Sequence, residues 1–261
     1  MSPFAHDLTT LPITDAPFPH AVLDHLFAPE MFAALERSYP ICPPASGPTG
    51  HTIHRGDGEF DAVMAAQPAW RELFDACHSQ GFVDALAGLF AAEIDRACVV
   101  RRQDLRFADH IETRAEKEQG RIAAPQLPPE AMFVRFDFMQ GMNAYVRRPH
   151  VDHRRRLGTM LIYFDTPGAD SFRGGDLILH DAKGAEVSRI SPAANRAVLF
   201  PCSDRSWHSV DAVTDCRRPR RFVQVAISGT HDIWPAASLP PKGLGARLRQ
   251  QAGRLRRALS V

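Results

Sequence analysis

His150 and Asp152 are separated by a single residue, Val151, within residues 148–153. Alternate residues of a β-strand project from the same face, so a strand here would point an imidazole and a carboxylate into one space. A catalytic metal usually needs a third protein ligand, and the best candidate is His208, 56 residues after Asp152. Two histidines and one carboxylate on one side of an ion leave coordination positions open for reactants. The H-x-D pattern alone occurs readily by chance, so the surrounding elements must support a metal site.

The composition is that of an ordinary globular chain. Its 261 residues, 44% hydrophobic and 23% charged, suit one substantial domain. Net charge is +1, but the residues from Lys242 onward carry six positive charges and no acid, which leaves −5 on the rest and does not indicate nucleic-acid binding. Five scattered cysteines indicate reduced thiols. With no secretory signal and no long apolar run, we expect a cytoplasmic protein without a transmembrane segment.

The first part of the chain favours helices. Pro29 and Pro68 stand where a proline can open a helix. Apolar residues then recur at helical spacing, and helices are expected to dominate up to about residue 96. Residues 41–60 are rich in Gly, Pro and His and are expected to form a loop, in which His51 and His54 are interpreted as solvated side chains.

Beyond residue 96 the pattern changes to short β-prone runs between turn-forming residues. They cover residues 99–107, 132–139, 143–151, 157–164, 176–180, 187–190, 197–200, 208–213 and 222–227. Many short strands are typical of a sandwich or barrel, and jelly rolls include the metal-binding cupins. The polar segment 112–130 between the first two runs is interpreted as a flap over the site.

Arginines cluster around both halves of the candidate metal motif. Arg217, Arg218, Arg220 and Arg221 follow His208 and lead into the last strand. A buried arginine there could bind a carboxylate through two parallel hydrogen bonds. Arginines at 135 and 154–156 could face an anionic substrate at the mouth of the site. His153 is expected to point to the face opposite Asp152.

Taken in order, these motifs resemble the Fe(II)- and 2-oxoglutarate-dependent dioxygenases, in particular the prolyl-hydroxylase-like branch. His150, Asp152 and His208 match the family's H-x-D…H metal ligands, which are also its catalytic residues. Residues 159–164, 174–177 and 195–200 resemble the strand after the motif, the Gly-Gly turn and the strand leading to the distal histidine. The resemblance covers residues 132–229. It implies an α+β fold with a double-stranded β-helix core, a cupin-like jelly roll, N-terminal helices packed against it and a short C-terminal helix.

The same resemblance implies Fe(II) as the metal, with 2-oxoglutarate and O2 as reactants. Succinate and CO2 would be released as an unactivated C–H bond is hydroxylated or otherwise oxidised. Asp152 stands where related halogenases have a small residue, which favours hydroxylation over halogenation.

The resemblance also implies residues that bind the cosubstrate. Aligned with the family's last strand, Arg220 would bind the distal carboxylate, and Arg218 has the same parity and is the second candidate. Tyr163 and Thr159 match positions that can hydrogen-bond the cosubstrate. Phe222 replaces a serine often found two positions after the arginine.

We expect one domain over residues 1–261, with mostly helical support at 1–96, the catalytic core at 97–230 and a tail at 231–261. The tail includes a basic helix at 244–259, which either packs on the domain or makes weak contact with a membrane surface or a partner. The expected substrate is a small or carrier-attached molecule. Two alternatives stay open, a cupin-type metal enzyme that does not use 2-oxoglutarate and a non-catalytic β-helix binding module.

Overall fold

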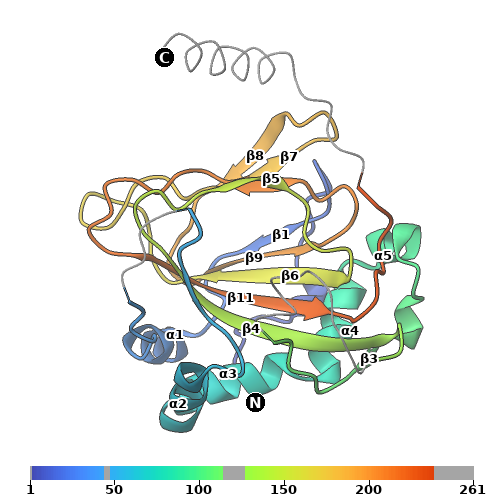
Figure 1. Ribbon diagram of the computed structural model, residues 1–261, viewed down its shortest axis with the longest axis horizontal. Coiled ribbons are helices and arrows are strands. Elements are labelled where there is room, and N and C mark those ends of the chain that lie inside the picture. Colours follow the sequence, from blue (N-terminus) through green and yellow to red (C-terminus); the bar gives the residue numbers. More distant parts are fainter. Residues whose placement is uncertain (1, 44–47, 114–126, 238–261) are drawn as a thin grey trace, which may run out of the picture.

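Two β-sheets face each other in the computed structural model, which describes residues 2–43, 48–113 and 127–237 (Figure 1). The larger sheet has the strand order β1-β9-β6-β11-β4-β2, with β3 parallel to β4, and the smaller has the order β5-β10-β7-β8. The strands are β1 (Ala21–Leu23), β2 (His51–Ile53), β3 (Arg106–Phe107), β4 (Ala131–Gly141), β5 (Arg147–His150), β6 (Arg156–Tyr163), β7 (Leu177–His180), β8 (Glu186–Ile190), β9 (Arg196–Pro201), β10 (His208–Val210) and β11 (Arg220–Ser228). The predicted α+β fold with a double-stranded β-helix core is confirmed.

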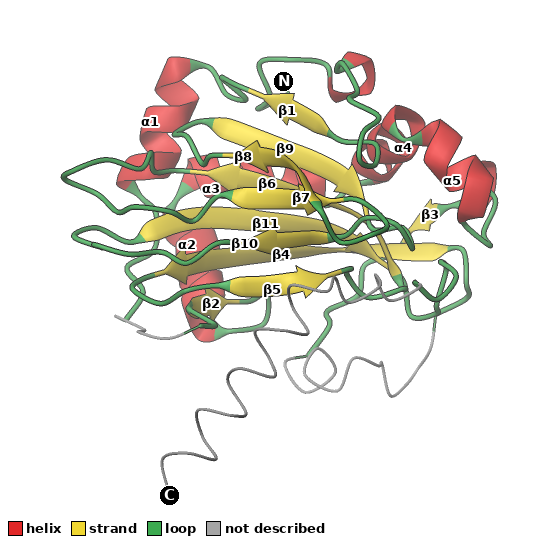
Figure 2. Ribbon diagram, turned by 90° about the horizontal axis from the view of Figure 1, so that it is seen from above, coloured by secondary structure: helices red, strands yellow, loops and turns green. Residues whose placement is uncertain are grey.

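The helices cover the face of the larger sheet that points away from the smaller one, as Figures 1 and 2 show. Pro29 and Pro68 open helices as predicted, and the Ser79 hydroxyl caps another by accepting a hydrogen bond from the Phe82 amide at 3.2 Å. The helices are α1 (Pro29–Arg37), α2 (Gly58–Ala66), α3 (Pro68–Cys77), α4 (Gln80–Leu89) and α5 (Ala91–Ala97), with short 3-10 turns at Leu8–Thr10 and Arg102–Asp104.

Strands of the larger sheet are buried on both faces and divide their side chains between two cores. On β4, Phe136 and Phe138 face the helices, where the Trp70 ring lies 4.7 Å from that of Phe138. Met139, one position on, joins Tyr163 in the second core, which lies between the two sheets. The period of two along each strand therefore assigns alternate residues to structural packing and to the space between the sheets.

Two parts of the secondary-structure prediction were wrong. Residues 41–60 are not simply a loop, because they include β2 and the start of α2. His54 is buried, and its Nδ1 lies 2.8 Å from Asp137 Oδ1, so it is not a solvated histidine. The strand expected at 99–107 is reduced to β3, because residues 102–104 form a 3-10 turn.

The basic helix expected at 244–259 and most of segment 112–130 lie outside the described residues. Within residues 2–43, 48–113 and 127–237, the helices are too short or too polar to span a bilayer.

Glu93 on α5 holds the connection that leads into β10. Its buried carboxylate accepts two hydrogen bonds from Arg96, at 2.9 and 3.0 Å, and two from Arg205, at 2.5 and 2.9 Å. Burial alone would raise the pKa of Glu93, but the hydrogen bonds from the two guanidinium groups lower it from 4.5 to about 2. Because Arg205 lies three residues before His208, this ion pair fixes the backbone that positions the histidine.

Glu93→Gln should lower the free energy of unfolding at pH 7 by on the order of 2 kcal/mol, because two charge-assisted forks are lost. The native pKa of Glu93 lies below its unfolded value, so its contribution is complete above pH 4.5 and disappears as the pH falls toward 2. Urea unfolding at pH 7 and pH 3 should show the gap between wild type and variant narrowing at the lower pH. Asp104→Asn, which breaks an exposed pair with Arg101, is the control and should change stability by less than about 1 kcal/mol. An equal gap at both pH values would contradict the role given to Glu93.

Candidate metal centre and adjoining pocket

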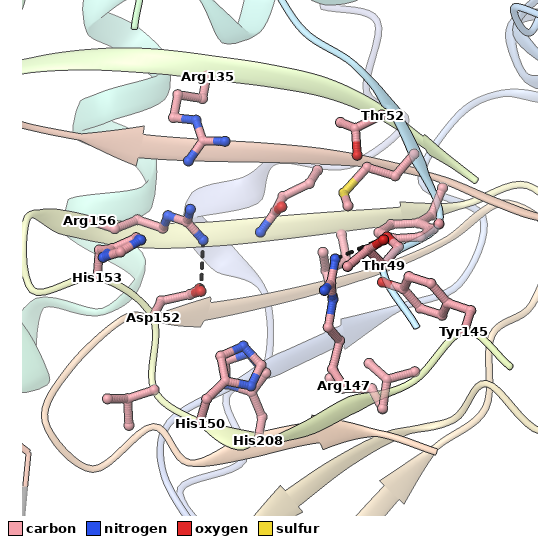
Figure 3. A pocket seen from close by; sticks show the side chains of 18 of the residues that line it. Thr49, Thr52, Arg135, Tyr145, Arg147, His150, Asp152, His153, Arg156 and His208 are labelled. Atoms are coloured by element: carbon pink, nitrogen blue, oxygen red, sulfur yellow. Dashed lines mark hydrogen bonds and ion pairs between the residues drawn. The ribbon is translucent and has the colours of Figure 1, made fainter. Parts of the chain in front are cut away.

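His150 and His208 meet across two neighbouring strands of the smaller sheet. They are direct partners in the antiparallel pairing of β5 with β10, and their ring centroids are 4.3 Å apart (Figure 3). Residues directly opposite in such a pair project to the same face, so both imidazoles enter the space between the sheets. The fold thus brings together two histidines that are far apart in the sequence.

Each imidazole has one nitrogen occupied and one available. His150 Nδ1 lies 2.8 Å from the Arg148 carbonyl oxygen, and His208 Nδ1 lies 2.9 Å from that of Ser206. A carbonyl oxygen only accepts, so each neutral ring carries its proton on Nδ1 and keeps the Nε2 lone pair for another partner. A hydrogen bond from the second nitrogen to a backbone carbonyl is the usual way in which proteins orient a metal-binding histidine.

Asp152 completes the group from the loop just after β5. The strand ends at His150, so the carboxylate is placed by the loop and not by strand alternation as the sequence predicted. Ligand atoms of the two histidines and Asp152 all lie within 4.8 Å of one another, and this is the one group of at least three potential metal ligands in the described residues. The donor set, two neutral imidazoles and a carboxylate, suits a ferrous ion with open coordination positions.

Both oxygens of Asp152 have protein partners that orient the carboxylate. Arg156 Nη1 lies 2.8 Å from Oδ1. The Thr159 hydroxyl and the Cys202 thiol donate to Oδ2 at 3.4 and 3.3 Å. Thr159 therefore supports the candidate metal ligand and does not line the pocket.

Charge and burial set the protonation states of the group. Burial alone would raise the pKa of Asp152, but the Arg156 guanidinium and the two histidines hold that pKa far below its usual range. Burial, together with the neighbouring His150, lowers the pKa of His208 to about 4. At neutral pH the site thus presents a carboxylate and a neutral distal imidazole, the forms that bind a metal.

A second polar group lies deeper in the same space. Arg220, 1% exposed, donates from Nε to the Gly175 carbonyl oxygen at 3.0 Å, and its guanidinium carbon lies 5.1 Å from the Tyr163 ring centroid. Arg220 Nη1 and the Tyr163 hydroxyl are buried without a hydrogen-bond partner. Burial raises the pKa of Tyr163, although the nearby Arg220 opposes this shift, so the phenol keeps its proton. Buried polar atoms without partners indicate a missing ligand, and here an acceptor such as a carboxylate fits both.

The Gly-Gly turn makes room for this arginine. Gly174 and Gly175 have φ angles of +72° and +78°, a region that favours glycine. A Cβ on Gly175 would stand 2.8 Å from Arg220 Cδ and 2.9 Å from its Nε. The turn therefore serves the buried cation as well as the chain reversal.

One cavity of about 1050 Å³ joins the two polar groups. Its lining includes His150, Asp152 and His208 together with Arg220. Phe222 and Gln224, which alternate with Arg220 along β11, also line it. A cavity of this size is at the upper end for a small-ligand site, where volumes of about 300–1,000 Å³ are usual.

Comparison with known proteins agrees with this geometry. Residues 136–227 match the family described as the 2OG-Fe(II) oxygenase superfamily. The segment that carries the candidate metal ligands is therefore a 2OG-Fe(II) oxygenase superfamily segment. Members of this superfamily use Fe(II), 2-oxoglutarate and O2, so the chain is an oxidoreductase. No curated protein matches the sequence significantly.

Several solved structures are similar to this chain at low sequence identity. A prolyl 4-hydroxylase structure from Phytophthora capsici is 17% identical, with a TM-score of 0.50 over 92% of this chain and 68% of the other. A Pseudomonas putida prolyl-4-hydroxylase is 16% identical, with a TM-score of 0.41 over 80% and 92% of the two chains. A Trichoplax adhaerens prolyl hydroxylase, solved with a hypoxia inducible factor peptide, is 13% identical, with a TM-score of 0.40 over 80% and 83%. At 17% identity and a TM-score of 0.50, the likeness to the Phytophthora capsici structure concerns the fold alone.

The structure separates the two arginines that the sequence offered for 2-oxoglutarate. Arg220 is buried in the cavity of the oxygenase, as described above. Arg218 is exposed, and its Nε donates to the Asp170 carbonyl oxygen at 3.2 Å, outside the cavity. The two residues share parity in the sequence, but only Arg220 lies on β11, which begins at that residue.

The arginines after the H-x-D motif lie differently from the prediction. All three have acidic partners: Arg154 pairs with Asp232, Arg155 with Glu112 and Arg156 with Asp152. They are therefore not a free cationic cluster at the mouth.

His153 was expected to face away from Asp152, but it lines the same cavity, because the chain has left the strand at this point (Figure 3). Sequence reasoning also missed Tyr145, Arg147 and Cys202. Tyr145 lies in the turn before β5 and Cys202 just after β9, and no local pattern in the sequence marks either residue.

Gly175→Ala should weaken 2-oxoglutarate binding by about tenfold or more, because the new methyl group displaces Arg220 from a fully packed position. Calorimetric titration of the Mn(II) form with 2-oxoglutarate measures the affinity. Mn(II) binding should stay unchanged, since the metal-ligand candidates do not contact Gly175. Gly184→Ala, which also has a positive φ but lies in the β7–β8 hairpin, is the matched control for backbone strain. Equal losses in both variants would contradict the role of Gly175.

Proposed function

We propose that this oxygenase hydroxylates an unactivated C–H bond, with His150, Asp152 and His208 as ligands of Fe(II). The observation that carries the proposal is the pair of opposed histidines with free Nε2 atoms beside the largely buried Asp152 carboxylate, in one cavity with an arginine whose Nη1 has no partner. Three protein ligands leave positions on the ion for 2-oxoglutarate and O2. When bound, these groups supply the oxidising chemistry, with succinate and CO2 as co-products.

The side chains of the protein bind the cosubstrate, orient a metal ligand and keep water out of the site. Arg220 supplies buried donors for the distal carboxylate of 2-oxoglutarate, and the Tyr163 hydroxyl is a second donor to the same group. Arg156 and Thr159 hold Asp152 in one orientation, so little rearrangement is needed when the metal binds. The apolar residues Leu161 and Phe200 line the cavity, Phe200 beside His208, and limit the access of water.

Asp152 also favours one reaction outcome. Its carboxylate is held by three partners and occupies the place that a halide would need. Hydroxylation is therefore the proposed outcome, in preference to halogenation.

The proposal also covers the domain organisation, the class of substrate and the cellular compartment. We propose that residues 97–230 form the catalytic part of a single domain, braced by the helices of residues 1–96. The substrate is a small or carrier-attached molecule, because a cavity of about 1050 Å³ has the size of a small-ligand site. The scattered cysteines support a reducing, cytoplasmic compartment.

The alternatives differ in their use of 2-oxoglutarate. A cupin-type metal enzyme would bind the metal without 2-oxoglutarate, and a non-catalytic module would bind neither. The buried unpartnered atoms of Arg220 and Tyr163 favour the oxygenase, because neither alternative gives them an acceptor.

His150→Ala and Asp152→Ala should each reduce Fe(II)-dependent conversion of 2-oxoglutarate to succinate by more than about 100-fold, since loss of an outer-shell partner alone costs ~10–100-fold. Succinate is quantified by NMR, and bound metal by elemental analysis. His6→Ala, which removes an exposed histidine, should keep full turnover. Full turnover by Asp152→Ala without added halide would refute the metal assignment.

Arg220→Ala should weaken 2-oxoglutarate binding by at least about 30-fold, because a buried charge-assisted fork is worth ~2 kcal/mol or more. Arg218→Ala should bind normally, because its side chain lies outside the cavity. Titration of the Mn(II) forms compares the two variants directly. If the wild-type protein binds Mn(II) but not 2-oxoglutarate, the cupin-type alternative is favoured.

A further inference from the structure

The cavity carries more positive charge than the metal centre and 2-oxoglutarate require. Two carboxylates line it, those of Asp152 and Asp232. Against these it has six arginines: Arg135, Arg147, Arg148, Arg154, Arg156 and Arg220. The net charge available to a ligand depends on which of these arginines already form ion pairs with carboxylates of the protein.

Half of the arginines are neutralised by acids. As described above, Arg154 and Arg156 each have an aspartate partner. Arg135 lies 2.8 Å from Glu112 and 2.7 Å from Asp137. Arg147, Arg148 and Arg220 have no carboxylate partner among the residues that the structure describes. The proposed function assigns Arg220 to 2-oxoglutarate, which leaves two uncompensated cations on β5.

Arg147 is the better placed of these two. Its guanidinium carbon lies 5.3 Å from the Tyr145 ring centroid, and that of Arg220 lies 5.6 Å from the same ring. Arg147 Nη2 donates to the Thr49 carbonyl oxygen at 3.2 Å. Figure 3 shows this guanidinium beside Thr49 and Tyr145, on the cavity side of β5 that also carries His150. The side chain is held in place while most of its donors remain available, an arrangement suited to an oxyanion.

Part of the wall of this cavity is apolar. Met139, Phe222 and Val210 line the cavity here. A molecule with an apolar part and one anionic end would match this distribution, and the cavity has room for it beside 2-oxoglutarate.

We propose that the molecule oxidised by this enzyme carries an oxyanion, a carboxylate or a phosphate, which Arg147 binds while Arg148 stands at the rim. The inference rests on the proposed function, because it takes Arg220 and the metal ligands as occupied by 2-oxoglutarate and the ion. Arg147 sets the orientation of the substrate, and the apolar part of the substrate lies toward His150 and His208. Neutral molecules of the same shape are selected against, because they leave the cation uncompensated.

The test measures binding and not turnover. Wild type and Arg147→Gln are loaded with Mn(II) and saturating 2-oxoglutarate, and then titrated with benzoate, phenyl phosphate and the neutral benzamide by ligand-observed NMR. At least one anion should bind wild type about tenfold more tightly than benzamide, the value of one charge-assisted hydrogen bond of ~1.5 kcal/mol. In Arg147→Gln this preference should fall below about twofold. The ratio of benzoate to phenyl phosphate distinguishes a carboxylate from a phosphate site.

Control variants separate recognition from structure. Arg101→Gln removes an exposed, remote arginine and should keep the preference. Arg147→Lys keeps the charge and should retain part of it, which guards against a folding defect in the glutamine variant. If Arg147 only fastens Thr49, Arg147→Gln will lower the unfolding temperature but keep the anion preference, and the inference is overturned. Equal binding of anions and benzamide by wild type overturns it as well.

The titration with 2-oxoglutarate is carried out first, and it tests the proposed function independently of the anion site. A wild-type protein that binds no 2-oxoglutarate refutes the proposed function. The anion preference of Arg147 is then measured in the Mn(II) form, where its loss in Arg147→Gln supports the anion site and its persistence overturns it.

Discussion

The cross-strand pairing of His150 with His208 is the constraint on which the rest of the site depends. Strand β10 is only three residues long, and it holds its register by pairing with β5 on one side and β7 on the other. A slip of one residue would turn His208 to the opposite face and remove it from the site. The ion pair of Glu93 with Arg205 stabilises the approach to this strand from outside the sheet.

Strand alternation in the larger sheet determines which side chains enter the cosubstrate pocket, just as strand register determines the position of His208. Val223 and Val225 on β11 pack with the helices, whereas Arg220, Phe222 and Gln224 face the space between the sheets. The apolar contacts that stabilise the fold thereby fix the direction of the polar residues between them. A rigid strand is a more exact support for a binding residue than a loop.

Charge burial gives the pocket its chemical character. Asp152 is compensated by Arg156, and Arg135 by Glu112 and Asp137. Arg220 is different, because aromatic rings surround it and one of its nitrogens lacks a partner. Burying such a cation is costly without a counter-charge, so the resting protein is arranged for an anionic ligand.

The sequence by itself determined the class of the fold and the identity of the candidate metal ligands. The H-x-D spacing, the distal histidine and the Gly-Gly turn are local patterns whose order along the chain carries the information. Short β-prone runs also predicted most strands of the core, because apolar alternation is a local property. The loop position of Asp152 escaped this reasoning, since a strand end is set by its pairing partners.

Only the tertiary structure decided which arginine faces which partner. Arg218 and Arg220 have equal parity in the sequence, but the start of β11 and the close approach of Gly175 bring only Arg220 into the cavity. For the same reason Arg156 pairs with Asp152, whereas Arg147, for which no role was expected from the sequence, lines the cavity. A long cationic side chain can point in several directions from one backbone position, and its partner, often far away in the sequence, selects the direction.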